Sequence, residues 1–334
     1  MAISITPNFS LESCNSFGFP ARAEHFISVT TEQDLCAALD AAKSSNWRVT
    51  LIGGGSNLVF TKDVSGLVIQ IALRGREQID CDVVLGAGEN WHDVVRWTVK
   101  ELHLQGLESL ALIPGTVGAA PVQNIGAYGV ELNRLNPRVR AFDRKTDTFV
   151  EFDTEQAGYA YRDSVFKRER DRYVITQVRL SLKSQDTAPV RYQDLADTLG
   201  VQLNEAVAIE SLFEGVVRVR QRKLPNPDDL GNAGSFFKNP IIGADQAGKL
   251  KALYPNMPVY PAGDDAKLSA GWLIEQAGWK GHRHKGVGVS EKHALVLVHY
   301  GNENGQALMR LAAQIQQSVE TEFGVRLEPE PRIL

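Results

Sequence analysis

Hydrophobic and polar positions near the start of the chain follow helix and strand periods in turn. Residues 29–42 carry apolar and small side chains at helical intervals, and Thr30 precedes Gln33 by the spacing of a capping box, so this segment predicts a helix. Short β-branched runs at 48–52 and 67–71 predict strands separated by a glycine turn. The pattern indicates an α/β unit in this part of the chain.

The next segment predicts another strand, glycine turn and helix. The strand is expected at 83–85, the turn at 86–90, and a helix with one apolar face at 91–102. Gly106 would end this helix as a C′ glycine. Residues 113–129 hold too many glycines and prolines for a regular element, which predicts an ordered loop.

The rest of the chain predicts an α+β region followed by a further α/β unit. Residues 139–182 alternate β-rich runs with charged turns. The Pro-, Asn- and Gly-rich residues 225–234 predict either a domain boundary or an active-site loop. Beyond them, the pattern predicts a strand at 293–300 and an amphipathic helix at 305–323 that packs on a sheet.

Composition and charge narrow the class of protein. The 334 residues include 43% hydrophobic and 23% charged residues, as in a compact globular protein and unlike a disordered or fibrous one. A formal charge of −4 argues against a nucleic-acid partner. No apolar run approaches the length of a membrane span, and the first residues lack a secretory-signal pattern. Three distant cysteines predict reduced thiols, so we expect a cytoplasmic protein without membrane attachment.

Three glycine-rich stretches, at 53–57, 86–90 and 113–129, are candidates for phosphate binding, because glycine lets backbone N–H groups converge on an anion. A dinucleotide-binding G-x-G-x-x-G would need glycine where Leu58 and Trp91 stand, and no G-K-[ST] triplet marks a P-loop. The stretches alone leave open a phosphate or dinucleotide site of another type, and also simple tight turns.

Three polar side chains are candidates for chemistry, but each also has an ordinary structural interpretation. Ser235 lacks the G-x-S-x-G context of a hydrolase nucleophile, so its local sequence favours a turn residue. Arg162 and Glu330, taken alone, have the character of surface charges. Spacing by itself therefore assigns none of the three to a reaction.

A basic cluster and a histidine pair are two further candidate binding sites. If residues 218–222 form a strand, Arg218, Arg220 and Arg222 share one side of it, as either a solvated basic edge or an anion site. His282 and His284 have no neighbouring cysteine that would complete a zinc site. We therefore expect no bound metal.

Eight motifs occur in an order typical of one enzyme family. They lie at residues 15–18, 53–57, 86–91, 113–118, 123–129, 161–164, 234–240 and 327–330. Over nearly the whole chain they resemble the UDP-N-acetylenolpyruvoylglucosamine reductase family (MurB), a family of bacterial cell-wall flavoenzymes. Residues 190–195 resemble its type I branch, which carries a tyrosine-bearing loop over the substrate.

The resemblance implies an α+β fold with a two-part FAD-binding α/β domain of the vanillyl-alcohol-oxidase-like (PCMH) type and a C-terminal α/β substrate-binding domain. We expect FAD-binding subdomain 1 at 1–65 and subdomain 2, with the tyrosine loop, at 66–218. The substrate-binding domain is expected at 219–322, and a C-terminal tail with the catalytic glutamate at 323–334.

The resemblance also implies a reaction in two steps. NADPH reduces noncovalently bound FAD, and hydride then passes to the enolpyruvyl group of UDP-N-acetyl-3-O-(1-carboxyvinyl)-glucosamine, giving UDP-N-acetylmuramate for peptidoglycan synthesis. The implied partners are the UDP-sugar and NADPH, with no nucleic acid and no membrane, and the chain is expected to be a monomer.

Motif by motif, the resemblance implies the site residues. Ser235 matches the proton donor, and Arg162 and Glu330 match the polar pair that stabilises the intermediate. The positions that match FAD contacts are Gly53, Gly54, Gly55, Ser56, Asn57, Gly115, Thr116, Gly118, Asn124, Ile125 and Gly126. The positions that match substrate contacts are Tyr128, Tyr161, Tyr192, Arg220, Lys223, Asn239 and His293.

The chemistry agrees with these roles and leaves two rival functions to test. Hydride addition builds negative charge on the substrate carboxylate, which a fixed guanidinium such as Arg162 would stabilise. One rival is an FAD-dependent oxidase of the same superfamily, which often tethers FAD through a His or Cys that is absent near residues 53–57. The other is a nonenzymatic UDP-sugar-binding protein, which would not need Arg162, Ser235 and Glu330 together.

One departure from the family pattern concerns the last motif. Pro331 follows Glu330, where the family more often has an aliphatic residue. Because proline restricts the residue before it, we expect an extended backbone at Glu330.

Overall fold

The computed structural model describes residues 3–334, which divide into two compact units, each discontinuous in sequence. Unit 1 comprises the N-terminal segment through Phe9 together with Ala23–Gly55 and Val64–Gln221. Unit 2 comprises Ser10–Arg22, Ser56–Asp63 and Arg222–Leu334. Two short segments of the N-terminal quarter therefore fold with the C-terminal third.

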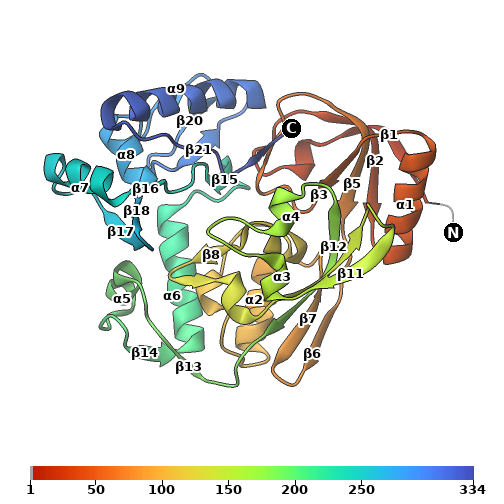
Figure 1. The fold of residues 1–334 in the computed structure, drawn as a ribbon, viewed down its shortest axis with the longest axis horizontal. Helices are drawn as coiled ribbons and strands as arrows, with labels where there is room; N and C mark the ends of the chain where they lie inside the picture. The colour runs from red at the N-terminus through yellow and green to blue at the C-terminus, as the bar shows by residue number, and fades with distance from the viewer. Residues whose placement is uncertain (1–2) are drawn as a thin grey trace. The chain divides into compact units, whose positions relative to one another are not determined.

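The first sheet of unit 1 has the strand order β1-β2-β5-β3, in which β2, β5 and β3 are parallel (Figure 1). The helix predicted at 29–42 is confirmed as α1, but its predicted start is wrong. Val29 still belongs to β2, and the cap is Thr31, whose side chain accepts a hydrogen bond from the Asp34 N–H. The elements are β1 (Thr6–Ser10), β2 (Arg22–Val29), α1 (Glu32–Ser44), β3 (Val49–Ile52) and β5 (Val64–Ile71).

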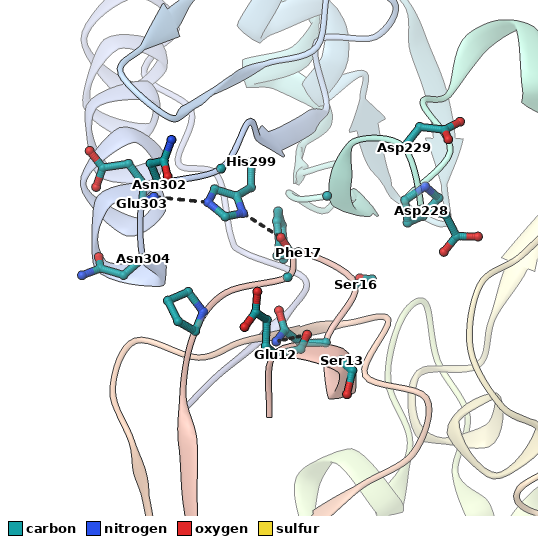
Figure 2. Close-up of a pocket in the computed structure, with 16 residues that line it drawn as sticks. Glu12, Ser13, Ser16, Phe17, Asp228, Asp229, His299, Asn302, Glu303 and Asn304 are labelled. Atoms are coloured by element: carbon teal, nitrogen blue, oxygen red, sulfur yellow. Dashed lines mark hydrogen bonds between the residues drawn. The ribbon is translucent and has the colours of Figure 1, made fainter. Parts of the chain in front are cut away.

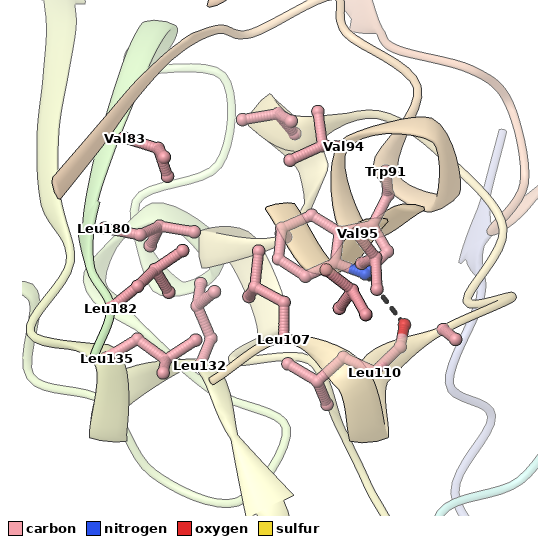
Figure 3. Close-up of a cluster of buried hydrophobic side chains, with 14 of the residues drawn as sticks. Val83, Trp91, Val94, Val95, Leu107, Leu110, Leu132, Leu135, Leu180 and Leu182 are labelled. Atoms are coloured by element: carbon pink, nitrogen blue, oxygen red, sulfur yellow. Dashed lines mark hydrogen bonds between the residues drawn. The ribbon is translucent and has the colours of Figure 1, made fainter. Parts of the chain in front are cut away.

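The second sheet of unit 1 is antiparallel, with the order β11-β10-β12-β7-β6. Helix α2 contributes Trp91 and its apolar face to the core beside Val83 of β7 (Figure 3). The Trp91 indole donates to the Leu110 carbonyl at 2.9 Å, which satisfies its buried N–H. The elements are β6 (Arg76–Ile79), β7 (Asp82–Gly86), α2 (Trp91–Lys100), β10 (Arg138–Asp143), β11 (Thr148–Phe152) and β12 (Tyr173–Ser181).

Two local predictions in unit 1 are wrong. Helix α2 ends at Lys100, and Gly106 lies beyond it in a loop, so Gly106 is not its C′ residue. Residues 218–222 belong to helix α6 and not to a strand. The remaining elements of this region are β8 (Gly126–Ala127), β9 (Val130–Glu131), α3 (Thr154–Ala157), α4 (Val165–Arg168), β13 (Thr187–Pro189), α5 (Gln193–Leu199), β14 (Ala206–Ala208) and α6 (Ile209–Lys223).

The main sheet of unit 2 is antiparallel, with the order β15-β21-β20-β19. The helix predicted at 305–323 is confirmed as α9, which is capped by Asn304 and buries Leu308, Leu311 and Ile315 in the core of this unit. The elements are β15 (Gly231–Ser235), α8 (Ala270–Gln276), β19 (Arg283–His284), β20 (Val287–Val289), β21 (Val296–His299) and α9 (Gly305–Phe323).

Unit 2 also contains two smaller sheets. One has the order β16-β18-β17 and packs with α7. The other joins the C-terminal strand β22 to β4 in parallel. The elements are β4 (Leu58–Val59), β16 (Ile241–Gly243), α7 (Ala244–Leu253), β17 (Val259–Ala262), β18 (Asp265–Leu268) and β22 (Arg332–Ile333). Across residues 3–334, no helix combines the length and apolarity needed to cross a bilayer.

Candidate functional site

Two of the predicted glycine loops approach each other closely in unit 1. A Cβ on Gly53 would lie 2.7 Å from the Thr116 Oγ1, and a Cβ on Gly54 would lie 3.4 Å from the Gly115 Cα. Gly55 has φ +70°, a left-handed conformation that favours glycine. The loops 53–55 and 115–116 therefore form a backbone-lined cradle that side chains would fill.

The glycine turn at 86–90 supports one wall of this cradle. The Val117 N–H donates to the Glu89 carbonyl at 2.9 Å, and the Gly118 N–H donates to the Ala87 carbonyl at 2.8 Å. A Cβ on Gly118 would lie 2.7 Å from the Ala87 Cβ, so only glycine allows this approach. The second predicted glycine turn thus orients the third glycine-rich stretch.

The Glu89 side chain ties this turn to the neighbouring β6–β7 region. The carboxylate, only 8% exposed, accepts hydrogen bonds from the Gly75 N–H at 2.9 Å and from the Arg76 Nε at 2.7 Å. Burial opposes ionisation, but these donors and the nearby guanidinium charges lower the pKa of Glu89 below its usual value. Glu89 is therefore ionised and paired at neutral pH.

Glu89→Gln is expected to lower the free energy of unfolding by about 1–3 kcal/mol at neutral pH, because an amide cannot replace the ionised acceptor. Since the pKa of Glu89 is lowered in the folded state, this stabilisation is present above the carboxyl's unfolded pKa and is lost as the pH falls through the folded pKa. Urea unfolding of both proteins from neutral to acidic pH should give curves that converge in acid. A difference independent of pH would contradict this role.

Asn124 holds the loop that leads from the cradle toward Arg162. Its fully buried amide Nδ2 donates to the Glu131 Oε2 at 3.0 Å and to the Ala160 carbonyl at 3.2 Å. Its Oδ1 accepts from the Asn133 N–H at 3.0 Å. The side chain predicted to contact the cofactor is thus bonded within the protein, and its backbone has a left-handed φ of 43°. The next residue, Ile125, which is also a predicted FAD contact, donates its N–H to the Ala120 carbonyl at 3.2 Å.

Arg162 lies beside this loop. Its Nη2 donates to the Gly126 carbonyl at 2.9 Å, and its guanidinium lies 5.3 Å from the ring centre of Tyr161. A Cβ on Gly126 would come within 3.4 Å of the Arg162 Nη1. The structure therefore brings Arg162 together with Tyr161 and Gly126, as expected for one site.

The predicted substrate contacts Tyr128 and Tyr192 also meet in unit 1. Their rings form an edge-to-face pair with centroids 5.6 Å apart, and Tyr192 is 45% exposed. Tyr192 stands immediately before α5, so the tyrosine segment contains a short helix and the β13–β14 pair as well as loops.

Arg220 presents a buried cation to the same group of residues. Its Nε is buried without a hydrogen-bond partner among the described residues. Burial is the main cause that lowers the pKa of Arg220, and the charge of Arg162 adds to it, while Tyr128 opposes it. Two neighbouring guanidinium groups with a tyrosine pair are suited to bind an anion such as a phosphate or carboxylate. Of the basic cluster, Arg218 and Arg222 lie on the exposed side of α6.

In unit 2, hydrogen bonds between two chain segments bring Glu330 next to Ser235. The Glu330 N–H donates to the Phe236 carbonyl at 2.8 Å, and Phe237 and Pro329 form an isolated antiparallel β-bridge. The Asn57 Nδ2 donates to the Glu330 carbonyl at 3.4 Å. Ser235 itself is exposed at the end of β15. The segment that carries Glu330 is therefore held on the strand that carries Ser235.

Asn57 and Pro331 explain how the C-terminal segment is anchored. The Asn57 carbonyl accepts from the Arg332 N–H at 2.9 Å, which starts the β4–β22 pair. Pro331 is buried between these bonds, at a position where no N–H is required. Ser56, a predicted FAD contact, precedes Asn57 in the same unit.

The other predicted substrate residues of unit 2 lie at helix ends and turns. The Asn239 Oδ1 accepts from the Ala270 N–H at 3.0 Å and so holds the start of α8. The His293 Nδ1 accepts from the Leu295 N–H at 3.2 Å, which leaves the proton on Nε2. Burial, then the charges of Lys223 and Lys280, lower the pKa of His293, and Glu275 opposes them. The structure thus brings His293 near Lys223, while the side-chain Oδ1 of Asn239 accepts a hydrogen bond from the first turn of α8.

A cavity of about 910 Å³ in unit 2 contains none of the predicted site residues (Figure 2). Its wall includes Glu12, Asp228 and Glu303. The His299 Nδ1 lies 2.8 Å from the Phe17 carbonyl, and its Nε2 accepts from the Glu303 N–H. This hydrogen bonding links the N-terminal segment of unit 2 to the β21–α9 connection.

Family models match both parts of the chain. Residues 23–141 match an FAD binding domain, and residues 226–334 match the C-terminal domain of UDP-N-acetylenolpyruvoylglucosamine reductase. A protein of that name from Cupriavidus pinatubonensis is 48% identical over 333 residues, which covers 98% of each chain. The chain belongs to the UDP-N-acetylenolpyruvoylglucosamine reductase family. A second reductase of that name, from Pseudomonas putida, is 42% identical over 339 residues, covering 100% of each chain.

A solved structure of the reductase family supports the fold. The UDP-N-acetylenolpyruvylglucosamine reductase from Thermus caldophilus matches with a TM-score of 0.68 and 24% identity, covering 100% of this chain and 99% of that one. The expected α+β fold with an FAD-binding domain is thereby confirmed.

The described residues fit FAD. The glycine cradle at 53–55 and 115–118 lies within the matched FAD binding domain, and its close backbone approach would be blocked by side chains at Gly53 and Gly118. FAD is the cofactor of this family member. Part of this cradle, at residues 53–55 and 115–118, is the candidate position for the cofactor's phosphates.

Proposed function

We propose that this chain catalyses the NADPH-dependent reduction of UDP-N-acetyl-3-O-(1-carboxyvinyl)-glucosamine to UDP-N-acetylmuramate with bound FAD, in peptidoglycan precursor synthesis. The observation that carries this is the end-to-end identity of 48% with a reductase of that name. The proposed site residues support it. Arg162 is hydrogen-bonded to the Gly126 carbonyl, and Glu330 is hydrogen-bonded to Phe236, the residue after Ser235.

Bound FAD supplies the hydride for this reaction. The substrate is an alkene conjugated to a carboxylate, so addition of hydride to one carbon places negative charge on the other carbon and the carboxylate. Arg162 is proposed to stabilise that charge. Ser235 is proposed to donate its hydroxyl proton to the adjacent carbon, which completes the saturated product. A neutral serine is a weak acid that needs polar neighbours to orient it. Glu330 is proposed to be such a neighbour and to help stabilise the intermediate.

The phosphate groups of the substrate need fixed positive charge. Arg220, whose buried Nε lacks a partner among the described residues, and Lys223 at the end of α6 are proposed to meet the diphosphate. Tyr192 is proposed to add a hydroxyl from the tyrosine segment, and Asn239 and His293 to line the rest of the sugar nucleotide. The glycine cradle is proposed to hold the FAD diphosphate noncovalently.

An anaerobic titration tests the whole proposal. The purified protein is expected to show a flavin absorption band that NADPH bleaches and that the enolpyruvyl sugar restores in the absence of oxygen. A protein without flavin would support the binding-protein alternative. A reduced flavin that oxygen, but not the sugar, reoxidises would support the oxidase alternative.

Tyr192→Phe is expected to weaken binding of the UDP-sugar by about 10- to 150-fold, because one hydrogen bond to a charged oxygen contributes about 1.5–3 kcal/mol. NADPH binding should change less. Isothermal titration of each ligand checks this, with Tyr300→Phe as the control tyrosine. An unchanged substrate affinity would remove Tyr192 from the site.

Residues 186–197 are further expected to become protected from hydrogen exchange when the UDP-sugar binds, as in segments that close over a ligand. Hydrogen exchange that does not change when the UDP-sugar is added would contradict closure of this segment.

Independently, we propose that the protein is a cytoplasmic monomer. Size-exclusion chromatography with light scattering would test the oligomeric state, and cell fractionation would test the location.

A further inference from the structure

Arg162 has a backbone conformation that needs support. Its φ is 55°, a left-handed conformation that strains the backbone of a non-glycine residue. It sits in a tight turn, because Ala160 and Asp163 exchange backbone hydrogen bonds at 3.0 and 3.1 Å. The position of the guanidinium therefore depends on what keeps this turn in place.

The two sides of the turn are held by different side chains. On one side, the buried Asn124 amide donates to the Ala160 carbonyl at 3.2 Å. On the other side, the Lys167 Nζ donates to the carbonyl of Arg162 itself at 2.8 Å. Lys167 thus places a cationic donor on the strained residue.

The helical turn that carries Lys167 is itself anchored. The fully buried Ser164 donates its hydroxyl to the Val122 carbonyl at 2.6 Å. The Lys167 N–H then donates to the Ser164 carbonyl at 3.1 Å, within α4. Lys167 therefore reaches back to Arg162 from a fixed base and not from a free loop.

We infer that Lys167 is a positioning residue for the reduction of the enolpyruvyl sugar: its ammonium group holds the Arg162 carbonyl and so keeps the left-handed turn that aims the guanidinium. The inference rests on the proposed role of Arg162. A charged donor makes a stronger hydrogen bond to a backbone carbonyl than a neutral donor does. A small displacement of a positioned cation removes much of its stabilisation of the transition state. Lys167 acts through Arg162 and does not contact the reacting atoms.

A double-mutant cycle tests this inference in the FAD-loaded protein. Lys167→Met, Arg162→Met and the double variant are compared by anaerobic stopped flow, with flavin bleaching by NADPH and flavin reoxidation by the enolpyruvyl sugar measured separately. Arg162→Met is expected to slow reoxidation by about 100-fold or more. Lys167→Met is expected to slow it by about 10- to 100-fold, with bleaching and FAD content unchanged. The double variant should be no slower than Arg162→Met, because both changes remove the same function.

The controls separate this inference from the function on which it rests. Lys43→Met, which removes a surface lysine paired with Asp147 at 2.9 Å in the same unit, should leave both half-reactions unchanged. If Lys167→Met does not fold with FAD, Lys167→Gln keeps a neutral donor and should still slow reoxidation selectively. A normal reoxidation rate, an equal loss in both half-reactions, or effects that multiply in the double variant would overturn the role of Lys167. Normal reoxidation in Arg162→Met would instead refute the proposed role of Arg162.

Discussion

Ser235→Ala is expected to leave bleaching of the flavin by NADPH near its normal rate and to slow reoxidation by the enolpyruvyl sugar by about 100-fold or more. The two half-reactions should separate because the proposed role of Ser235 is to protonate carbon after hydride transfer. The exposed position of Ser235 at the end of β15 makes a folding defect from loss of its hydroxyl a minor concern. Stopped-flow absorbance of the flavin, without oxygen, measures both rates.

The control for this experiment is Ser13→Ala, an exposed serine elsewhere in unit 2, which should change neither rate. Equal losses in both half-reactions of Ser235→Ala would mean that the serine supports the structure and does not donate the proton. Reoxidation rates in H2O and D2O give a second test. If Ser235 donates the proton, the wild-type protein should show a solvent isotope effect on reoxidation, and this effect should differ in the alanine variant.

Gly55→Val is expected to purify without FAD and without colour. Gly55 is buried at φ +70°, and valine is strongly disfavoured there because its branched Cβ clashes with the backbone. The change would displace loop 53–55, whose neighbour Gly54 lies against Gly115 in the cradle. The ratio of flavin to protein absorbance, together with a denatured-flavin assay, measures the occupancy.

Gly263→Val is the matched control for this variant. Gly263 has a similar left-handed φ of +64°, and a Cβ there would meet nothing within 4 Å, so the backbone strain is comparable but the cradle is untouched. This control should retain FAD even if its melting temperature falls. Full FAD occupancy in Gly55→Val would place the cofactor elsewhere, and FAD loss in both variants would mean that backbone strain alone releases it.

Regular elements with strong periodicity were predictable from the sequence. The apolar stripe at 305–323 predicted α9 with the bounds that the structure has. Boundaries failed where a tertiary contact overrode a local one. The spacing of Thr30 and Gln33 predicted a helix from residue 29, but Val29 pairs with Ile71 in the sheet and the observed cap is Thr31. The shared side of Arg218, Arg220 and Arg222 held only for a strand, and this segment belongs to helix α6, whose apolar face is buried.

The candidate site divides in the same way. Motif order alone identified the family and singled out the glycine stretches, Arg162, Ser235 and Glu330. It also marked Asn124 as a cofactor contact, yet its amide is bonded to residues 131, 133 and 160. No sequence signal distinguished Lys167 from the other charged residues after Ser164, because its importance depends on one bond to the Arg162 carbonyl.

By itself, then, the sequence determined which chemistry is available, since residue types and their order define the glycine cradle, the catalytic candidates and the family. Only the tertiary structure decided which of these groups are already engaged in hydrogen bonds within the protein. Hydrogen bonds between distant segments, such as Glu330 to Phe236 and Asn124 to Ala160, set the positions of the polar groups. Such bonds depend on the packing of elements far apart in sequence, which local periodicity and propensity do not encode.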